Sequence, residues 1–492
     1  MFEILTQGDP RLERPSQPVQ WPDTDLQAQL DALHEALADF RQRKGFGRAI
    51  AAPQIGIGKR FIALNLGATP FALINPQISW RSEAQFEVWD DCLSVPESVV
   101  RVARHESISV HYLDEQGRPR FWPELPPDLS ELVQHEIDHL DGVLMTERAV
   151  DEHSIRPIAE HAELVGSSRP VHRLSLQSIA QAWRVIDPVF VRSPQYECEP
   201  LSQALGCKLT LKAETLNPLR SFKGRGADYF VARATARGDE RAIVCASAGN
   251  FGQALAYACA KHRRKITVYA AAGANPLKVE RMLALGADVR LEGEDFDMAK
   301  AAARRHAGDQ GAWMVEDGLE PEISEGAGTI GLELLRRADA FDAVTVPLGN
   351  GALLNGIARW LKAAAPATRV LGVCAEGADA MQKSWRTGSA VTGTSANTIA
   401  DGIAVRVPVV ESVDDMRGQV DDVVLVNDDT IVEAMRALYR HAGLLIEPAG
   451  AAGVAAVLAD RDRFEGKHVA TVLCGSNLTQ AQIGQWLSTS RR

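Results

Sequence analysis

The chain has 492 residues, of which 46% are hydrophobic and 24% charged, and its net charge is −11. This length predicts two or three domains, because single cores rarely grow beyond about 250–300 residues. The negative charge disfavours nucleic acid as a partner, and no apolar run approaches the ~20 residues of a membrane span. The start MFEILTQGDPRLERPSQP is unlike a secretory signal and the seven cysteines form no CxxC pair, so a cytoplasmic protein with reduced thiols is expected.

The first 150 or so residues have the pattern of a strand-rich α+β domain. Short apolar or alternating runs closed by Gly, Pro and Asn-Pro turns predict strands in RFIALNL, FALINPQISW and SISVHYLDEQGRPRFW. The stretch DLSELVQHEIDHLDGVLM then carries apolar residues at helical spacing and a glycine stop at Gly142. It predicts one long functional helix.

That helix contains an HExxH pattern. His135 and His139 lie one turn apart on one face, so both rings can reach one cation, and Glu136 is placed to act on a bound water. Upstream, Cys92 in WDDCLSVP offers a thiolate. A Cys/His/His set leaves a fourth tetrahedral position to water, as catalytic metal sites require. The alternative is a surface helix that happens to hold two histidines.

Three ordered motifs in this half resemble those of the peptide deformylases. They are GRAIAAPQIG (47–56), DDCLSVP (90–96) and QHEIDHLDG (134–142), and the resemblance spans about 160 residues. It implies deformylation of an N-formyl amino acid or peptide, with Fe²⁺ or Zn²⁺ bound by Cys92, His135 and His139. It further implies proton transfer by Glu136 and oxyanion stabilisation by the Gln54 amide and the Leu93 backbone N–H.

Two positions depart from the deformylase pattern. Ala49 replaces the second glycine of the first motif, and Asp90-Asp91 stands where Glu-Gly is usual before the cysteine. The added Cβ and the carboxylate are expected to reshape substrate access. The alternative for this half is a degenerate domain kept for packing or regulation.

The pattern changes after about residue 150. VGSSRP (165–170) loses all periodicity and is interpreted as a linker, with a boundary near 168 between domains 1–167 and 168–492. Beyond it, the strand-like runs RAIVCAS, KITVYAA, DAVTVPLG, RVLGVCAE and HVATVLCG alternate with Ala-rich helical patterns. This alternation predicts an α/β domain with a parallel sheet.

Three segments of the second half suggest a pyridoxal phosphate site. Lys223 lies in NPLRSFKGRGADYF, where a lone lysine would usually be a solvated cation. SAGNFGQ (247–253) follows a strand and precedes a helix, where backbone N–H groups can receive a carboxylate or phosphate. VPLGNGALLNGIA (346–358) repeats that arrangement and suits a phosphate dianion, although either glycine turn alone is more often a tight connection.

Together these segments resemble the threonine dehydratase branch of the fold-type II pyridoxal phosphate enzymes. The resemblance covers about 320 residues, from LSLQSIAQ to the C-terminus, and implies two parallel-sheet subdomains and a homodimer. It implies that Lys223 binds pyridoxal 5'-phosphate covalently and then moves the substrate Cα proton. The other implied cofactor contacts are Phe222, Asn250 at the ring hydroxyl, the phosphate turn Gly349, Asn350, Gly351, Ala352 and Leu353, and Cys474 at the ring nitrogen. The implied substrate contacts are Ser221, Ser247, Ala248, Gly249 and Asn250.

One residue of the phosphate turn departs from the family pattern, and two further residues bear on the type of reaction. Asn350 replaces a glycine, which is tolerable because Asn accepts left-handed backbone angles better than most residues. Ala248 stands where the related serine racemases carry an acid–base serine, so elimination is favoured over racemisation. The neutral thiol of Cys474 cannot enforce protonation of the ring and suits prompt β-elimination, although a free cysteine is often simply a buried hydrophobe.

The two halves suggest one hypothesis for the whole chain. An N-formyl amide cannot displace Lys223, whereas deformylation would expose the free α-amine that the second site needs. We therefore expect a bifunctional enzyme that deformylates a small N-formyl β-hydroxy or β-substituted amino acid and eliminates it to a 2-oxo acid and ammonia. The alternatives are a deformylase acting on unrelated formyl peptides, a β-replacement synthase in the second half, or a regulatory or structural first domain.

Overall fold

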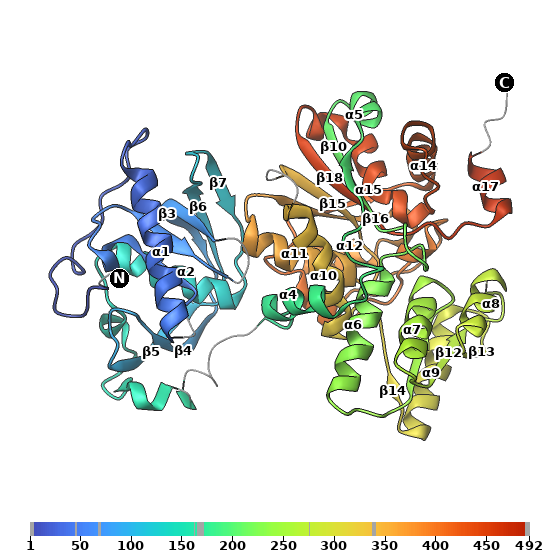
Figure 1. The fold of residues 1–492 in the computed structure, drawn as a ribbon, viewed down its shortest axis with the longest axis horizontal. Helices are drawn as coiled ribbons and strands as arrows, with labels where there is room; N and C mark the ends of the chain where they lie inside the picture. The colour runs from blue at the N-terminus through green and yellow to red at the C-terminus, as the bar shows by residue number, and fades with distance from the viewer. Residues whose placement is uncertain are drawn as a thin grey trace. The chain divides into compact units, whose positions relative to one another are not determined.

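The computed structural model describes residues 4–44, 47–66, 70–161, 163–164, 172–274, 276–336 and 341–487. The chain divides into two compact units, Met1–Arg173 and Leu174–Arg492 (Figure 1). The boundary expected near 168 falls outside the described residues. Within the described ranges, no helix is both long and apolar enough to span a membrane.

The first unit contains two antiparallel sheets. One has the strand order β1-β2-β3-β6-β7, and the other has the order β4-β5-β8. The strands are β1 (Ala49–Ala51), β2 (Phe61–Leu64), β3 (Phe71–Arg81), β4 (Gln85–Asp91), β5 (Ser98–His105), β6 (Ile108–Leu113), β7 (Pro119–Trp122) and β8 (Ile155–Pro157). The strands predicted in this half are all present, and the α+β class is as expected.

The helices α1 and α2 pack against these sheets. The predicted helix is α2 (Pro127–Leu140), and Gly142 follows it with a positive φ of 77°. Helix α1 (Leu26–Lys44) was not predicted, although Leu26, Leu30, Leu33 and Leu37 repeat at helical spacing and enter one buried cluster. Short 3₁₀ turns complete the unit at η1 (Ala52–Ile55), η2 (Met145–Arg148) and η3 (Ile158–Glu160).

The second unit is built on two sheets of mainly parallel strands. The larger has the order β17-β16-β15-β18-β10-β9, in which only β9 runs antiparallel, and the smaller has the order β13-β12-β11-β14. The larger sheet comprises β9 (Gln195–Glu197), β10 (Lys208–Ala213), β15 (Ala343–Pro347), β16 (Arg369–Ala375), β17 (Asp422–Val426) and β18 (His468–Leu473). The smaller comprises β11 (Ile243–Ala246), β12 (Ile266–Ala270), β13 (Asp288–Leu291) and β14 (Trp313–Met314). Two parallel-sheet subdomains are therefore confirmed.

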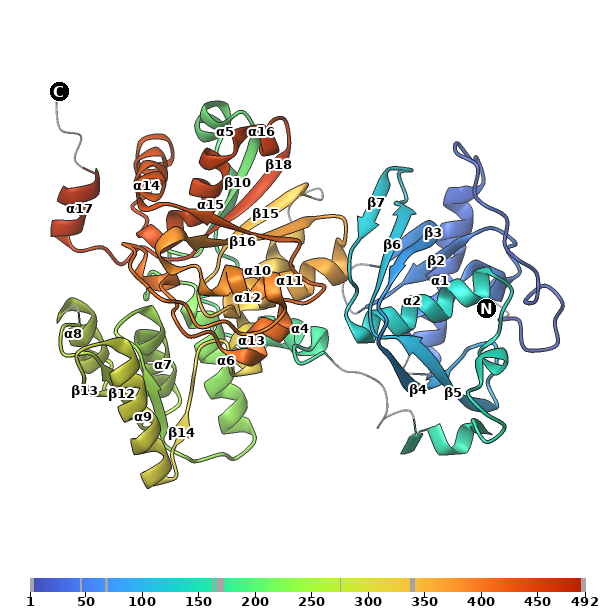
Figure 2. The same ribbon diagram turned by 180° about the vertical axis from the view of Figure 1, so that it is seen from behind.

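Helices pack on both faces of the larger sheet (Figures 1 and 2). Strand residues alternate between two buried clusters, with Leu371 and Val373 in one and Val370 and Cys374 in the other, as the period of a β-strand requires. The helices of the unit are α4 (Leu176–Val185), α5 (Glu199–Leu205), α6 (Lys223–Ala236), α7 (Asn250–Lys261), α8 (Pro276–Ala284), α9 (Phe296–Gln310), α10 (Pro321–Arg336), α11 (Ala352–Ala364), α12 (Ala380–Thr387), α13 (Val410–Asp415), α14 (Asp428–Ala442), α15 (Pro448–Ala459), α16 (Arg461–Phe464) and α17 (Gln480–Leu487), with 3₁₀ turns at η4 (Glu376–Ala378) and η5 (Asp401–Ile403).

Candidate functional sites

The three predicted metal ligands lie together in the first unit. Cys92 follows β4, while His135 and His139 project from one face of α2, and all three side chains are buried. The Cys92 Sγ lies 3.2 Å from His139 Nε2, and one ligand atom from each residue lies within 4.8 Å of the others. Donors around one tetrahedral ion with bonds of about 2.0–2.3 Å are separated by roughly 3.5 Å, so the set fits Zn²⁺ or Fe²⁺.

The two histidines differ in their surroundings. Burial and the neighbouring His135 hold the pKa of His139 well below its ordinary value, so this ring is neutral, as a metal ligand must be. Burial also acts to lower the pKa of His135, but Asp90 and Cys92 outweigh it and raise that pKa above its ordinary value. A metal ion at this site would therefore have to displace a proton from the His135 ring.

Asp90 orients the His135 ring through a contact with its Nδ1 atom. Its Oδ2 lies 2.8 Å from His135 Nδ1 and also accepts a hydrogen bond of 3.1 Å from Arg104, whose second nitrogen lies 2.5 Å from Asp138. A carboxylate on the far nitrogen of a ligating histidine fixes the tautomer and the ring orientation. The sequence interpretation missed this role; its expectation that Asp90-Asp91 reshapes substrate access stays a prediction. Asp91 contacts His161 at 3.2 Å. Ala49, the other departure, is buried in β1.

The predicted base and oxyanion donor lie beside the ligands. Glu136 is buried on α2, its Oε2 has no hydrogen-bond partner among the described residues, and burial raises its pKa to about 7. Gln54 accepts a 2.8 Å hydrogen bond from the Ala51 N–H, which fixes its amide, and its Nε2 lies 3.9 Å from Cys92 Sγ. Leu93 follows Cys92 directly and is half-buried. The structure thus brings the predicted residues of this half together.

In the second unit, Lys223 opens α6 after the buried Ser221 and Phe222. Its Nζ lies 2.6 Å from Asp317 Oδ2 and 4.6 Å from the centre of the Phe222 ring. The pocket around it is lined by Phe222, Lys223, Asp317, Pro347, Gly349, Asn350, Gly351, Ala352, Leu353, Gly402, Ile403 and Cys474. The lysine, the whole predicted phosphate turn and Cys474 therefore share one pocket.

The phosphate turn is a tightly packed cradle at the N-terminus of α11. Gly351 has φ 95°, and a Cβ added there would lie 1.9 Å from Ser412 Oγ, so only glycine fits. The tolerance of Asn for left-handed angles is not needed at Asn350, because the positive φ belongs to Gly351. Asn350 instead accepts a 2.6 Å hydrogen bond from Ser412 on its carbonyl. The backbone N–H groups in the first turn of α11 can bind a phosphate. The residues of this turn therefore fit the phosphate group of the cofactor.

The turn expected to hold the substrate carboxylate precedes α7. Ser247 Oγ accepts hydrogen bonds from the N–H groups of Gly249 and Gly252 at 3.1 and 3.0 Å, which fixes the turn around Ala248. A Cβ at Gly249 would lie 4.0 Å from the Nζ of Lys278, a buried lysine on α8 that the sequence interpretation missed. A cation here would strengthen binding of a carboxylate.

Asn250 is held on both sides of its amide. Its Nδ2 donates a 2.8 Å hydrogen bond to Glu447, and its Oδ1 accepts one of 2.8 Å from Asn477. Burial, with a contribution from the nearby Asp401, raises the pKa of Glu447 to about 6. This support was also missed, because it joins segments about two hundred residues apart; it fixes the amide that is expected to meet the ring hydroxyl.

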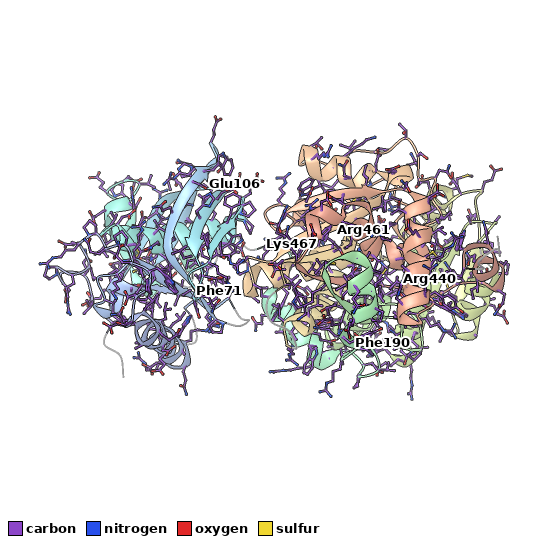
Figure 3. All side chains as sticks on the ribbon, turned by 90° about the horizontal axis from the view of Figure 1, so that it is seen from above. Phe71, Glu106, Phe190, Arg440, Arg461 and Lys467 are labelled. Atoms are coloured by element: carbon purple, nitrogen blue, oxygen red, sulfur yellow. The ribbon has the colours of Figure 1, made fainter. Side chains whose placement is uncertain are left out.

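Cys474 directly follows the strand β18 and lies in a buried cluster that also contains residues of α11. Burial and the nearby Glu447 raise the pKa of its thiol well above the ordinary value, so the thiol is neutral. Its carbonyl accepts a 3.1 Å hydrogen bond from the N–H of Phe222, which ties the end of β18 to the lysine segment. Phe190 (Figure 3) packs so closely against the start of α6 that a Cβ at Gly224 would lie 2.4 Å from its ring.

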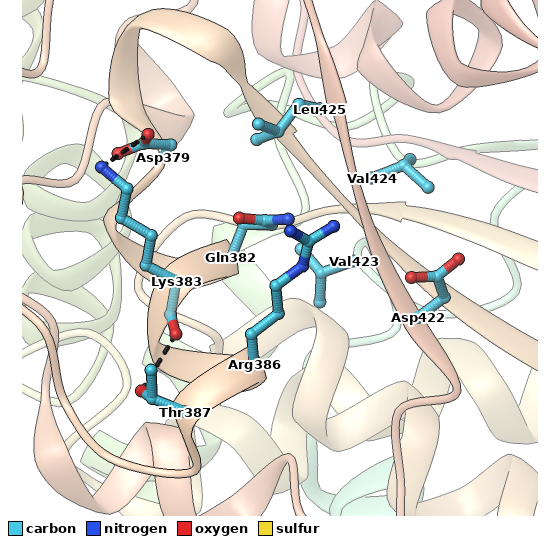
Figure 4. A pocket seen from close by; sticks show the side chains of 9 residues that line it. All are labelled: Asp379, Gln382, Lys383, Arg386, Thr387, Asp422, Val423, Val424 and Leu425. Carbon is cyan, nitrogen blue, oxygen red and sulfur yellow. Dashed lines mark hydrogen bonds and ion pairs between the residues drawn. The ribbon is translucent and has the colours of Figure 1, made fainter.

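A separate hollow lies between α12 and the edge strand β17 (Figure 4). Its polar lining is mostly engaged within the protein: Lys383 pairs with Asp379 at 2.9 Å, and Asp422 pairs with Arg463 at 2.7 Å. None of the site residues predicted from the sequence lines it.

Comparisons with known proteins match the two units separately. A model of the family described as polypeptide deformylase matches residues 1–154, and one described as pyridoxal-phosphate dependent enzyme matches residues 186–475. The L-threonine ammonia-lyase of Thermotoga maritima is 36% identical over 305 residues, which are 62% of this chain and 76% of that relative.

Solved structures also resemble the second part of the chain. The processed form of threonine deaminase isoform 2 from Solanum lycopersicum is 28% identical with a TM-score of 0.59, over 63% of this chain and 93% of that one. Maize serine racemase is 28% identical with a TM-score of 0.60, over 64% of this chain and 96% of that one. The chain therefore belongs to the family of pyridoxal-phosphate dependent enzymes, and a segment that matches the polypeptide deformylase family precedes the family region.

Proposed function

We propose that the second unit catalyses β-elimination of a small β-hydroxy amino acid, giving a 2-oxo acid and ammonia. The observation that carries this proposal is the shared pocket of Lys223, the 349–353 turn and Cys474. The names of the relatives, a threonine ammonia-lyase and a threonine deaminase, support the substrate class. Ala248 provides no hydroxyl for a second proton transfer at Cα, which favours elimination over racemisation.

The roles of the residues follow from their positions. Pyridoxal phosphate, when bound, supplies an electron-withdrawing ring that stabilises negative charge at the substrate Cα. The N–H groups at the start of α11 would hold its phosphate, and the amide of Asn250 would meet its ring hydroxyl. The neutral thiol of Cys474 leaves the ring nitrogen weakly bonded, and the amine of Lys223 takes the proton from Cα.

For the first unit, we propose hydrolysis of an N-formyl group. Cys92, His135 and His139 would hold Fe²⁺ or Zn²⁺, and the ion supplies Lewis-acid polarisation of the formyl oxygen. Glu136, with a pKa raised to about 7 by burial, can accept a proton from water and return it to the leaving amine near neutral pH. The fixed Nε2 of Gln54 and the backbone N–H of Leu93 would donate to the developing oxyanion.

The two reactions are proposed to act in sequence on one substrate. Only a free α-amine can take the place of the Lys223 amine at the cofactor. Hydrolysis of an N-formyl amino acid releases such an amine. Joining both sites in one chain raises the local concentration of the intermediate. The proposed substrate is therefore an N-formyl β-hydroxy amino acid such as N-formyl-threonine.

A panel of substrates tests each half separately. The purified protein, loaded with cofactor and metal, is given free threonine and serine, N-formyl-threonine, and a formyl-methionyl peptide, while formate and oxo acid are measured. We expect oxo acid from the free amino acids and more formate from N-formyl-threonine than from the peptide. Formate released only from the peptide would mean that the two halves act on unrelated substrates. Failure to form oxo acid from both free amino acids would refute the elimination.

A further inference from the structure

The strongest polar contact at Lys223 is made by a carboxylate that the reaction described above does not use. Asp317 Oδ2 lies 2.6 Å from Lys223 Nζ, and both side chains are largely buried, with 12% and 15% exposed. Asp317 also lines the pocket formed by the phosphate turn and Cys474. A carboxylate in direct contact with a proton-transferring amine can exchange a proton with it.

The loop holds Asp317 firmly in this position. The preceding Glu316 turns the other way, toward α9, where it binds Lys300 at 2.5 Å and Arg304 at 2.7 Å. The following Gly318 has φ 86°, and a Cβ added there would lie 2.2 Å from the carbonyl oxygen of Asn350. The loop is thus packed against the phosphate turn, and Asp317 alone of the two carboxylates faces the pocket.

The second oxygen of Asp317 is not engaged by the described part of the protein. Within the described part of the chain, Oδ1 is buried and has no hydrogen-bond partner. Buried carboxylate oxygens are normally bonded, because an unpaired one costs about 1–3 kcal/mol or more. One oxygen of this pocket-lining carboxylate therefore contacts the amine of Lys223, while the other has no partner among the described residues.

We propose that Asp317 passes the proton from Lys223 to the departing β-substituent of the substrate, an inference that rests on the proposed elimination. The Cα–H bond breaks and its proton goes to Lys223 Nζ, while its electron pair forms the Cα=Cβ bond only when the β-substituent departs. Lys223 gives a proton to the Asp317 carboxylate. The Asp317 carboxyl group then protonates the β-oxygen as the Cβ–O bond breaks with its electron pair, so water leaves and the carboxylate is restored.

The chemistry of the leaving group makes this role specific. Hydroxide is a poor leaving group and departs readily only when it is protonated, whereas chloride departs as the anion. A positioned general acid typically contributes 10²–10⁴-fold to such a step. Asp317 should therefore matter for serine far more than for β-chloroalanine, which shares the same carbon skeleton and gives the same oxo acid.

The test compares these two substrates in the full chain loaded with cofactor. For Asp317→Asn, which keeps the size but cannot carry the proton, we expect the ratio of kcat/KM for serine to that for β-chloroalanine to fall by about 10²-fold or more. Asp317→Glu, which keeps an acid, should restore part of the ratio. Cofactor loading of each variant is followed separately by the visible absorbance of the titrated apoprotein.

A matched control is Asp421→Asn. Asp421 Oδ2 also lies 2.6 Å from a buried lysine, Lys362, but outside the pocket, so the ratio should stay at the wild-type value. If both substrates slow equally in Asp317→Asn while loading is normal, Asp317 only positions Lys223 and the inference is overturned. An unchanged ratio and rate overturn it as well. A wild type that forms oxo acid from neither substrate instead refutes the proposed elimination, and this inference with it.

Discussion

Replacing Asp90 by Asn should weaken metal binding in the first unit without removing any ligand. Asp90 is buried, and its Oδ2 lies 2.8 Å from His135 Nδ1 and 3.1 Å from an Arg104 nitrogen. An amide in its place can still accept a hydrogen bond, but it carries no charge. The His135 ring then loses the carboxylate that orients it and increases its basicity.

The size of the effect follows from these contacts. Loss of a carboxylate that supports a ligating histidine typically costs 10–100-fold in metal affinity or activity, which is about 1.4–2.8 kcal/mol. Arg104 keeps its 2.5 Å contact with Asp138, so no buried cation is left without a partner. We therefore expect the fold to survive, with a loss of roughly 1–3 kcal/mol in the free energy of unfolding.

The assay is competition for Zn²⁺ against a chelating dye at fixed pH, with formate release measured on the same samples. Asp91→Asn is the matched control, because Asp91 lies next in the chain but contacts His161 rather than a ligand. We expect the dissociation constant to rise 10–100-fold in Asp90→Asn and less than about 3-fold in Asp91→Asn. Equal affinity in Asp90→Asn and wild type would refute the reasoning that Asp90 supports the metal site.

Three further predictions concern the second unit. Gly351→Ala places a Cβ 1.9 Å from Ser412 Oγ at a φ of 95°, so cofactor affinity, measured by absorbance titration, should fall about 10-fold or more. Burial raises the pKa of Glu325 from 4.5 to about 7, so the folded state binds its proton more tightly and stability is lost as pH rises from 4.5 to about 7. Glu325→Gln should therefore raise the free energy of unfolding at pH 8 by up to roughly 3 kcal/mol, but not at pH 4, as denaturant titrations at the two pH values can show. Arg225→Met removes the guanidinium that bridges the buried Glu214 and Glu333, although Lys212 stays 2.6 Å from Glu333, and urea unfolding should show a loss of about 3–5 kcal/mol.

Residues carried by local motifs could be predicted from the sequence. The HExxH spacing places His135 and His139 on one helical face, and the alternation of strands with Ala-rich helices predicts the parallel sheets. The contact of Asp90 with His135 could also have been predicted in this way. Asp90 and Cys92 lie two residues apart at the end of a strand, where the period of two directs both side chains to the same face.

Contacts between distant segments could not be predicted in this way. Asp317 lies 94 residues after Lys223, and Glu447 lies 197 residues after Asn250. Each pair meets only because the sheets place the ends of different strands together, and no spacing in the sequence marks either carboxylate. The helix α1 is a different case, because its buried leucines recur at helical spacing and could have been used to predict it.

The central claim is that the first site exposes the amine that the second site uses. Its most direct measurement is a time course of formate and 2-oxobutyrate released from N-formyl-threonine by wild type, Glu136→Ala and Lys223→Ala. We predict that formate precedes the oxo acid in wild type, that Lys223→Ala releases formate only, and that Glu136→Ala releases neither product from the formyl substrate while still converting free threonine. Release of 2-oxobutyrate from N-formyl-threonine by Glu136→Ala at the wild-type rate would contradict the account.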